Sequence, residues 1–181
     1  RDKYERVTFN FFGGDFLTFS DKRRFANIVL SDKKNIENII NSIGTDALVI
    51  SFNNFKNLIS SKKSKIKQNL MNQNIIAGIG NIYADEILWK AKIHPERIAN
   101  SITEKELKNI FVAMNMILKK SIKLRGISIQ DYRDILGNKG EYQNHRLVYG
   151  RDGEKCKRCG AQIQRIKIAQ RSAHFCSKCQ K

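Results

Sequence analysis

The sequence Cys156-Lys157-Arg158-Cys159, followed after sixteen residues by Cys176-Ser177-Lys178-Cys179, decides how the last part of this chain folds. Two Cys-x-x-Cys pairs at this separation can place four thiolates at the corners of a tetrahedron, which is the geometry of a closed structural zinc site. Four unrelated cysteines or two disulfides are the alternative, but this spacing is the specific zinc pattern and leaves no cysteine over. We therefore expect one structural Zn²⁺ ion, bound by Cys156, Cys159, Cys176 and Cys179.

The residues between the two cysteine pairs predict a β-hairpin. Apolar residues nearly alternate up to Ile168, and a second short run follows Arg171, which is typical of two short strands joined by a turn. The tip then falls near Gln170 and Arg171. Arg171 would be held out on a rigid, metal-clamped finger, where its fork of donors suits a phosphate group.

The charge of the chain indicates its class of partner. Lys and Arg number 34 against 17 Asp and Glu, which gives a net charge of +17 and a pI near 9.9. An excess this large points to a polyanion, most simply nucleic acid. AT-rich codons would also explain a coat of solvated lysines, but not the placement of the arginines.

We expect no membrane partner, because no apolar run could span a bilayer and no signal peptide is visible. Thiols arranged as a metal site indicate a reducing cytoplasm.

The first thirty residues predict strands and a basic loop. Residues 3–20 alternate loosely around Gly13-Gly14-Asp15, so we expect two strands joined by that turn. Next come Arg23, Arg24 and Phe25, where arginines can donate to base edges or phosphates and an aromatic ring can enter a gap in a base stack. A surface turn with Phe25 in the core fits these residues equally well.

The middle of the chain predicts helices, over residues 32–43, 51–59, 62–71, 81–90 and from the capping box at Thr103 to Arg125. Gly78 and Gly80 precede Asn81, the expected N-cap, and a helix start approached through glycines can bind phosphate. Asp85 and Glu86 are neighbours and cannot share one helix face, so we expect them to favour the helix start by their charge rather than to form an active site.

A later loop contains Gly137 and Gly140, whose backbone N–H groups would be free to donate to a bound base. An ordinary connecting loop is the simpler interpretation of these residues alone.

Several of these motifs together resemble the formamidopyrimidine-DNA glycosylase family: Ala77–Glu86, His94–Arg97, Val148–Arg151, Ala169–Ser172 and Asp21–Phe25. The resemblance covers nearly the whole chain and is weaker to the endonuclease VIII branch. It implies an α+β fold. Residues 1–30 would be the terminal strands of an N-terminal β-sandwich, residues 31–145 a helical domain with a helix-two-turns-helix motif, and residues 146–181 a zinc-finger β-hairpin.

The resemblance also implies a function. The family consists of bacterial base-excision repair enzymes that remove oxidised purines such as 8-oxoguanine and formamidopyrimidines, and then cut the abasic strand by lyase chemistry. The implied partner is double-stranded DNA with an oxidised purine or an abasic site. The implied protein is a monomer that works in the cytoplasm, on the nucleoid.

The resemblance assigns roles to particular residues. Asn81 would contact a phosphate beside the lesion, and Arg171 would hold the phosphates at the flipped nucleotide. Arg23 would donate to the orphaned base, Arg24 would lie near backbone phosphate, and Phe25 would fill the stack. The loop that would close over the everted base contains Gly137, Asn138, Lys139, Gly140, Glu141 and Tyr142.

One departure from the family concerns the chemistry. The family's nucleophile is an N-terminal proline followed by a glutamate, whereas this chain starts with Arg1 and its one proline, Pro95, is internal. We therefore expect a fragment or processed chain with no catalytic residue of its own, which binds damaged DNA and zinc. The alternative is a stand-alone, non-catalytic, zinc-dependent DNA-binding module. A zinc-ribbon RNA-binding or ribosomal protein would leave the arginine pattern unexplained.

Overall fold

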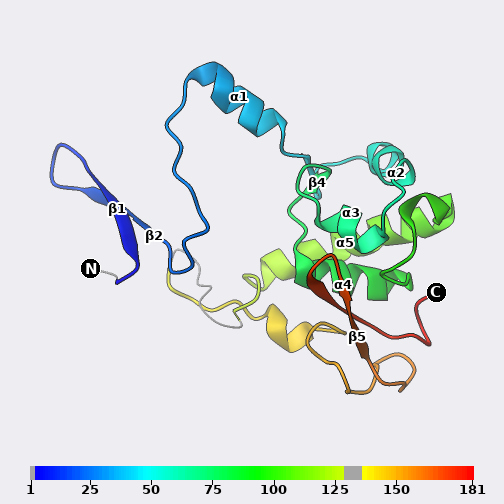
Figure 1. Ribbon diagram of the computed structural model, residues 1–181. Helices are drawn as coiled ribbons and strands as arrows, with labels where there is room; N and C mark the ends of the chain where they lie inside the picture. Colours follow the sequence, from blue (N-terminus) through cyan, green and yellow to red (C-terminus); the bar gives the residue numbers. More distant parts are fainter. Residues whose placement is uncertain (1–2, 129–135) are drawn as a thin grey trace. The chain divides into compact units, whose positions relative to one another are not determined.

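The computed structural model describes residues 3–128 and 136–181 (Figure 1). The chain groups into two compact units, Arg1–Ile39 and Ile40–Lys181, and each is described by itself. Among the described residues, no helix is long and apolar enough to cross a membrane.

The first unit begins with an antiparallel hairpin of β1 (Glu5–Asn10) and β2 (Phe16–Ser20). Gly13 and Gly14 form its turn at positive φ, 106° and 94°, which glycine adopts without steric cost. The predicted strands and turn are thereby confirmed. Helix α1 (Lys33–Asn41) follows, and the carboxylate of Asp32 accepts the backbone N–H of Asn35 at 2.8 Å as the expected N-terminal cap.

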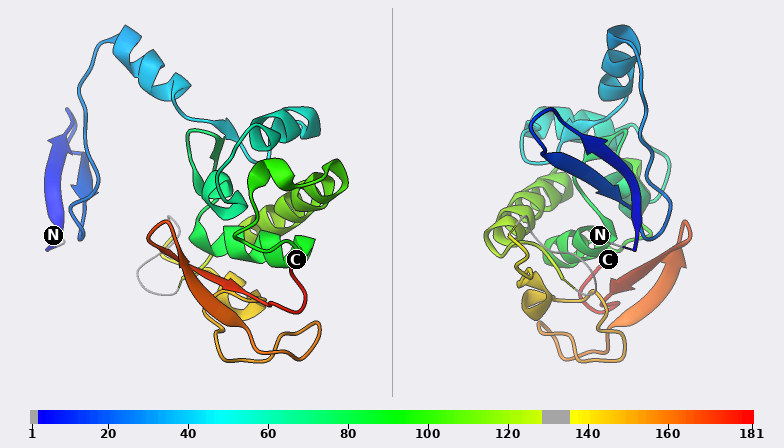
Figure 2. Two further views of the ribbon diagram at one scale, coloured as in Figure 1. Left: turned by 45° about the vertical axis from the view of Figure 1, so that its right-hand side comes forward. Right: turned by 90° about the vertical axis from the view of Figure 1, so that its left-hand side faces the viewer.

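The second unit contains most of the helices and two short sheets. In chain order its elements are β3 (Thr45–Asp46), α2 (Phe52–Ser60), α3 (Ile66–Met71), β4 (Ile76–Ala77), α4 (Asn81–Ala91), the 3-10 turn η1 (Ala99–Ser101), α5 (Glu104–Lys123), the 3-10 turn η2 (Tyr142–His145), β5 (Gln164–Ile168) and β6 (Arg171–Phe175). Strands β3 and β4 pair in parallel. Helix α4 lies against α5, α3 and strand β6, as the views of Figure 2 show.

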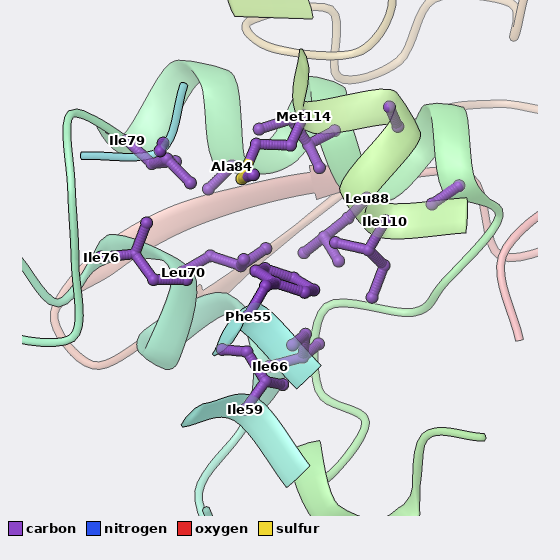
Figure 3. Close-up of a cluster of buried hydrophobic side chains, with 14 of the residues drawn as sticks. Phe55, Ile59, Ile66, Leu70, Ile76, Ile79, Ala84, Leu88, Ile110 and Met114 are labelled. Atoms are coloured by element: carbon purple, nitrogen blue, oxygen red, sulfur yellow. The ribbon is translucent and has the colours of Figure 1, made fainter. Parts of the chain in front are cut away.

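The core of the second unit surrounds α4. Seven of the eleven residues of this helix are buried. Figure 3 shows the neighbouring side chains from α2, α3, β4 and α5, among them Phe55, Leu70, Ile76 and Met114. Burying each large apolar side chain contributes about 1.5–3 kcal/mol. Ile122, on the last turn of α5, lies outside this core: it is 64% exposed and lines an open cavity.

The predicted hairpin between the cysteine pairs is confirmed. Strands β5 and β6 pair antiparallel up to Ile168 and Arg171. Ala169 and Gln170 form the tip with φ values of 45° and 63°, the conformation of a tight two-residue hairpin turn. Arg171 therefore starts the return strand beside the tip.

Candidate zinc and nucleic-acid site

The four cysteines come together at the base of the hairpin. Their Sγ atoms all lie within 4.8 Å of one another, and Cys159 Sγ lies 3.5 Å from Cys176 Sγ. Sulfurs of a tetrahedral zinc site are about 3.8 Å apart, since a Zn–S bond is about 2.3 Å long. A disulfide needs about 2.05 Å, and all four thiols are free. Four sulfur donors at this spacing fit one structural zinc ion, and the disulfide alternative is wrong.

Hydrogen bonds hold the two cysteine pairs in their turns. The backbone N–H of Cys156 donates to Ala161 O at 2.7 Å, and that of Cys176 donates to Gln180 Oε1 at 2.8 Å. Burial raises the pKa of Cys156, but the N–H groups of Arg158, Trp89 and Cys159 outweigh it and lower this pKa to about 6. The environment of Cys156 therefore favours the thiolate, which is the form that binds metal.

The hairpin is fastened to the helices by a buried ionic cluster. Asp85 Oδ1 lies 2.6 Å from Lys67 Nζ, and Asp85 Oδ2 accepts the backbone N–H of His174 at 2.8 Å. Lys67 Nζ also donates to the carbonyl oxygen of Ser172 at 2.5 Å. Burial lowers the pKa of Lys67, and the Asp85 carboxylate opposes that shift. One cluster thus joins α3 and α4 to the strand that begins at Arg171.

The expected role of Asp85 and Glu86 at the helix start was wrong. Both residues are buried, and each ties α4 to a distant segment. The Glu86 carboxylate accepts the backbone N–H groups of Leu147, Val148 and Tyr149 at 2.8–3.0 Å. Burial raises the pKa of Glu86, while these three donors lower it. The signal in the sequence was two acids inside an otherwise apolar helical stretch.

The turn before α4 is shaped by Gln73. Its Oε1 accepts the N–H of Gly78, which has φ 94°, and its Nε2 donates to Ile79 O, both at 2.9 Å. The N-cap is Gly80, in extended conformation, rather than Asn81 as expected. Asn81 is the first residue of the helix, and its buried Oδ1 has no hydrogen-bond partner within the described part of the chain.

Arg171 lies exposed at the hairpin tip. Together with Lys67, Met71 and Asn72 it lines a cavity of about 270 Å³ between α3 and the hairpin. The anchored Ser172 carbonyl is in the next residue, so the backbone that carries Arg171 is fixed.

In the first unit, Asp21 builds the loop that carries Arg23, Arg24 and Phe25. Its carboxylate accepts the backbone N–H groups of Arg23, Arg24 and Ala26 at 2.8–2.9 Å. These donors, Ala26 first, lower the pKa of Asp21. The Phe25 ring is 76% exposed and is not part of a core within its unit, and the Arg23 guanidinium lies 4.9 Å from its centroid.

Part of the glycine loop is described. Gly137, Asn138, Lys139 and Glu141 are exposed, whereas Gly140 and Tyr142 are buried. The Gly140 N–H donates to Ser128 Oγ at 2.8 Å, so the expectation that it is free to donate to a ligand was wrong. The Tyr142 N–H donates to Gly126 O at 3.0 Å. The preceding part, residues 129–135, lies outside the described residues.

A cavity of about 590 Å³ opens beside the closing end of this loop. Its walls are the end of β3, the start of α4 and the end of α5, with Ile82, Tyr83, Ile122 and Gly126 among the lining residues. This cavity could not be predicted from the sequence, because its walls come from three separate segments.

Comparison with known proteins places these features in one family. A model described as the formamidopyrimidine-DNA glycosylase H2TH domain matches residues 43–133, which is half of the chain. The chain belongs to the formamidopyrimidine-DNA glycosylase family. A second model, described as the zinc finger found in FPG and IleRS, matches residues 153–181 and includes all four cysteines of this glycosylase-family chain. The predicted family and zinc ion are confirmed.

Individual relatives agree. The formamidopyrimidine-DNA glycosylase of Herpetosiphon aurantiacus is 42% identical over 181 residues, which cover 99% of this chain and 66% of that relative. The Lactococcus lactis enzyme, solved with DNA containing an abasic site, superposes with a TM-score of 0.86 at 39% identity, over 100% of this chain and 68% of that one. A variant of it with DNA containing Fapy-dG gives a TM-score of 0.86 at 38% identity, over the same shares. The chain therefore spans about two thirds of the length of the glycosylases it matches.

Proposed function

We propose that this chain is the damaged-DNA-binding part of a bifunctional formamidopyrimidine-DNA glycosylase and abasic-site lyase. The observation that carries the proposal is the buried cluster of Lys67, Asp85 and His174. It makes one rigid body of the hairpin with Arg171 and the helix that starts at Asn81. Two groups suited to phosphate are thus held at a constant separation on a chain of net charge +17.

In this proposal Arg171 and Asn81 bind phosphates of the strand that carries the damage. Arg171 supplies a planar fork of donors, which pairs with phosphate oxygens better than a lysine does. Asn81 supplies the N–H donors of its side-chain amide at the start of α4, where the helix dipole also favours an anion. These contacts position the duplex without reading its sequence.

The loop in the first unit is proposed to replace the extruded nucleotide. Asp21 stiffens the loop, so the exposed Phe25 ring is presented without further ordering and can stack in the gap. Arg23 is proposed to donate to the base opposite the lesion, and Arg24, at φ 57°, to lie near a phosphate.

The everted base is proposed to enter the cavity beside α4 and α5, with Gly137, Asn138, Lys139, Gly140, Glu141 and Tyr142 closing over it. The C-terminal end of this loop, Gly140 to Tyr142, is hydrogen-bonded to residues 124–128. Within the described residues, the exposed Gly137 and Lys139 make no such hydrogen bonds to that segment. Extruding a base costs a few kcal/mol, which the phosphate contacts and the filled stack offset.

Catalysis in the whole protein is proposed to use a proline amine that attacks the sugar of the damaged nucleotide, a covalent mechanism. This chain has no such group among its 181 residues, so its own contribution is grip, stack filling and base capping. We further propose the division into residues 1–30, 31–145 and 146–181, oxidised purines as substrates, a monomer, and a place in the bacterial cytoplasm.

The test uses the zinc-loaded chain with two fluorescent duplexes, one intact and one with a tetrahydrofuran abasic-site analogue. We expect tighter binding to the abasic duplex, because it lacks the base that must otherwise be unstacked. Equal affinity would favour a stand-alone module that binds only the phosphate backbone. In parallel, borohydride trapping on a duplex with one 8-oxoguanine should give no covalent adduct. An adduct would mean that another amine of this chain acts as nucleophile.

A further inference from the structure

Two cavities meet at the C-terminal end of α4. The first, of about 350 Å³, lies between that end and the middle of α5, and the second, of about 520 Å³, reaches the zinc finger. They share the lining residues Ala91, Lys92 and Asn109, and we call the two together the α4-end groove. It lies within the second unit, and the proposed function gives it no role.

Hydrogen bonds fix one wall of the groove, the segment after β6. The Gln180 side chain, 2% exposed, donates to Ile93 O at 2.8 Å. The Lys181 N–H donates to Lys92 O at 3.2 Å, and the Lys181 carbonyl oxygen accepts the His94 N–H at 2.9 Å. The wall that the finger contributes therefore keeps its place against the end of α4.

Two cations of the groove are also held in place. The guanidinium carbon of Arg158 lies 3.9 Å from the ring centre of Trp89, whose indole belongs to the small core of the finger, and this guanidinium donates to Trp89 O at 3.0 Å. Lys92 follows α4 with φ 65°, a left-handed conformation that glycine usually supplies at the end of a helix. A lysine at a backbone position that favours glycine points to a use for its side chain.

The groove carries an excess of positive charge. Its lining includes five basic side chains, those of Lys90, Lys92, Arg158, Lys178 and Lys181. Glu106 is the one acidic side chain among the described lining residues, and Arg97 already binds its carboxylate at 2.8 Å. A Zn²⁺ ion with four thiolates carries a charge of about −2, which the five cations exceed. The groove therefore attracts anionic groups.

An apolar strip on α5 lies beside these cations. Val112 and Met116 line the groove and are each 49% exposed, so their burial by a partner would be favourable. A phosphate backbone would satisfy the cations but leave both side chains in water. A second copy of this chain would be repelled by its own net charge of +17. The combination fits an acidic protein segment that also carries large apolar side chains.

The groove lies away from the groups proposed to bind DNA. Asn81 starts α4 and Lys90 lies in its last turn, about 14 Å further along the axis. Arg171 lies at the hairpin tip, whereas the groove borders Cys179, beyond the other end of β6 (Figure 1). A segment bound in the groove would leave the proposed phosphate contacts open.

We propose that the α4-end groove binds a short acidic segment of a protein partner, in which aspartates or glutamates flank one or two large apolar side chains, while DNA is held at the other end of α4. The cations speed and orient the encounter, and burial of the apolar side chains supplies most of the affinity. Only the simultaneous binding of DNA rests on the proposed function.

The test follows the fluorescence anisotropy of a labelled peptide, in which two leucines lie among aspartates and glutamates, as the zinc-loaded chain is added. We expect binding. The same peptide with amides in place of its acids, and another with serines in place of its leucines, should both bind more weakly. Equal binding of either control peptide, or no binding of the acidic leucine peptide, would overturn the proposal.

Two substitutions remove cations without disturbing the fold. Lys92→Gly removes an ammonium group and suits the backbone at φ 65°, and Lys90→Gln changes an exposed position. Together they should weaken binding of the acidic leucine peptide about fivefold or more. Lys63→Gln, at an exposed lysine outside the groove, is the matched control and should change it by less than about twofold. Equal weakening in both would mean that only the overall charge matters and would overturn the proposal.

Two further measurements distinguish the other occupants. The double variant should bind abasic duplex within about twofold of the wild type, because the groove lies more than a Debye length of about 8 Å from Asn81. A loss as large as that for the peptide would make the groove a DNA contact and overturn the proposal, whereas a wild type that binds no duplex would speak against the proposed function alone. Sedimentation should show one copy of the chain, and a dimer that Met116→Ser dissociates would make a second copy the occupant and overturn the proposal.

Discussion

The ammonium group of Lys67 lies 2.6 Å from Asp85 Oδ1, with 1% and 0% of the two side chains exposed. Removing one partner of a buried pair leaves an uncompensated charge. We therefore expect Asp85→Asn to lower the free energy of unfolding by about 3 kcal/mol, measured by urea denaturation of the zinc-loaded chain. Because the same carboxylate holds the His174 backbone, the variant should also weaken DNA binding.

The control for this pair is Lys65–Glu96, an ion pair also on the α3 side of the structure but 38% and 42% exposed at the side chains. Glu96→Gln should cost less than about 1 kcal/mol, because solvent screens an exposed pair. Similar losses in the two variants would mean that burial does not set the strength of the Lys67–Asp85 pair.

Removal of zinc should disorder the hairpin. Cys159→Ser leaves three sulfur ligands and an incomplete tetrahedron, so we expect the variant to lose its metal and to bind DNA more weakly. Zinc content by atomic absorption and affinity by fluorescence anisotropy check the two effects. An unchanged affinity in a metal-free variant would show that the hairpin is not needed for binding.

Arg171→Ala tests the phosphate role of the hairpin tip. Loss of one phosphate contact should weaken binding to abasic DNA and reduce the slope of log affinity against log salt by about 1. Lys105→Ala, on the first turn of α5, removes the same charge from an exposed position away from the hairpin. Its salt slope should stay close to that of the wild type, and equal slopes for Arg171→Ala and wild type would count against the contact.

The pair of Arg97 and Glu106 predicts a pH effect. The Arg97 guanidinium lies 2.8 Å from Glu106 Oε1 and, as the main cause, lowers the pKa of Glu106 from 4.5 to about 2. An acid with a lowered pKa binds more protons when unfolded, so its stabilising effect is complete above pH 4.5 and is lost as the pH falls toward 2.

Glu106→Gln should remove this effect while it keeps the capping box with Thr103, because glutamine can replace glutamate there. Between pH 6 and pH 3 the wild type should lose more stability than the variant, by about 1 kcal/mol or less for a partly exposed pair. Both are compared metal-free, by urea denaturation. Equal losses of unfolding free energy in wild type and variant would show that a group other than Glu106 is responsible for the pH dependence.

Much of this fold is predictable from short-range patterns. The cysteine spacing gives the zinc site, the alternation before Ile168 gives the hairpin and its tip, and the capping box at Thr103 gives the start of α5. Each pattern rests on neighbours within one turn or one hairpin, where local geometry decides the structure.

The errors concern contacts between distant segments. Asp85 binds His174, 89 residues away, and Glu86 binds backbone N–H groups 61–63 residues away. Local rules for a helix assign both acids to its surface charge, and only the packing of the finger against α4 buries them. Asn81 was predicted as the N-cap by residue type, but the extended backbone of Gly80 takes that position.

Because the Glu86 carboxylate accepts the backbone N–H groups of Leu147, Val148 and Tyr149, the zinc finger depends on α4 and is not an independent folding unit. A peptide starting at Arg146 would keep its four cysteines, yet the backbone N–H groups of residues 147–149 would face water in place of a carboxylate, and its small core would lack an indole. Grafting this finger onto another scaffold would therefore require that α4 travel with it.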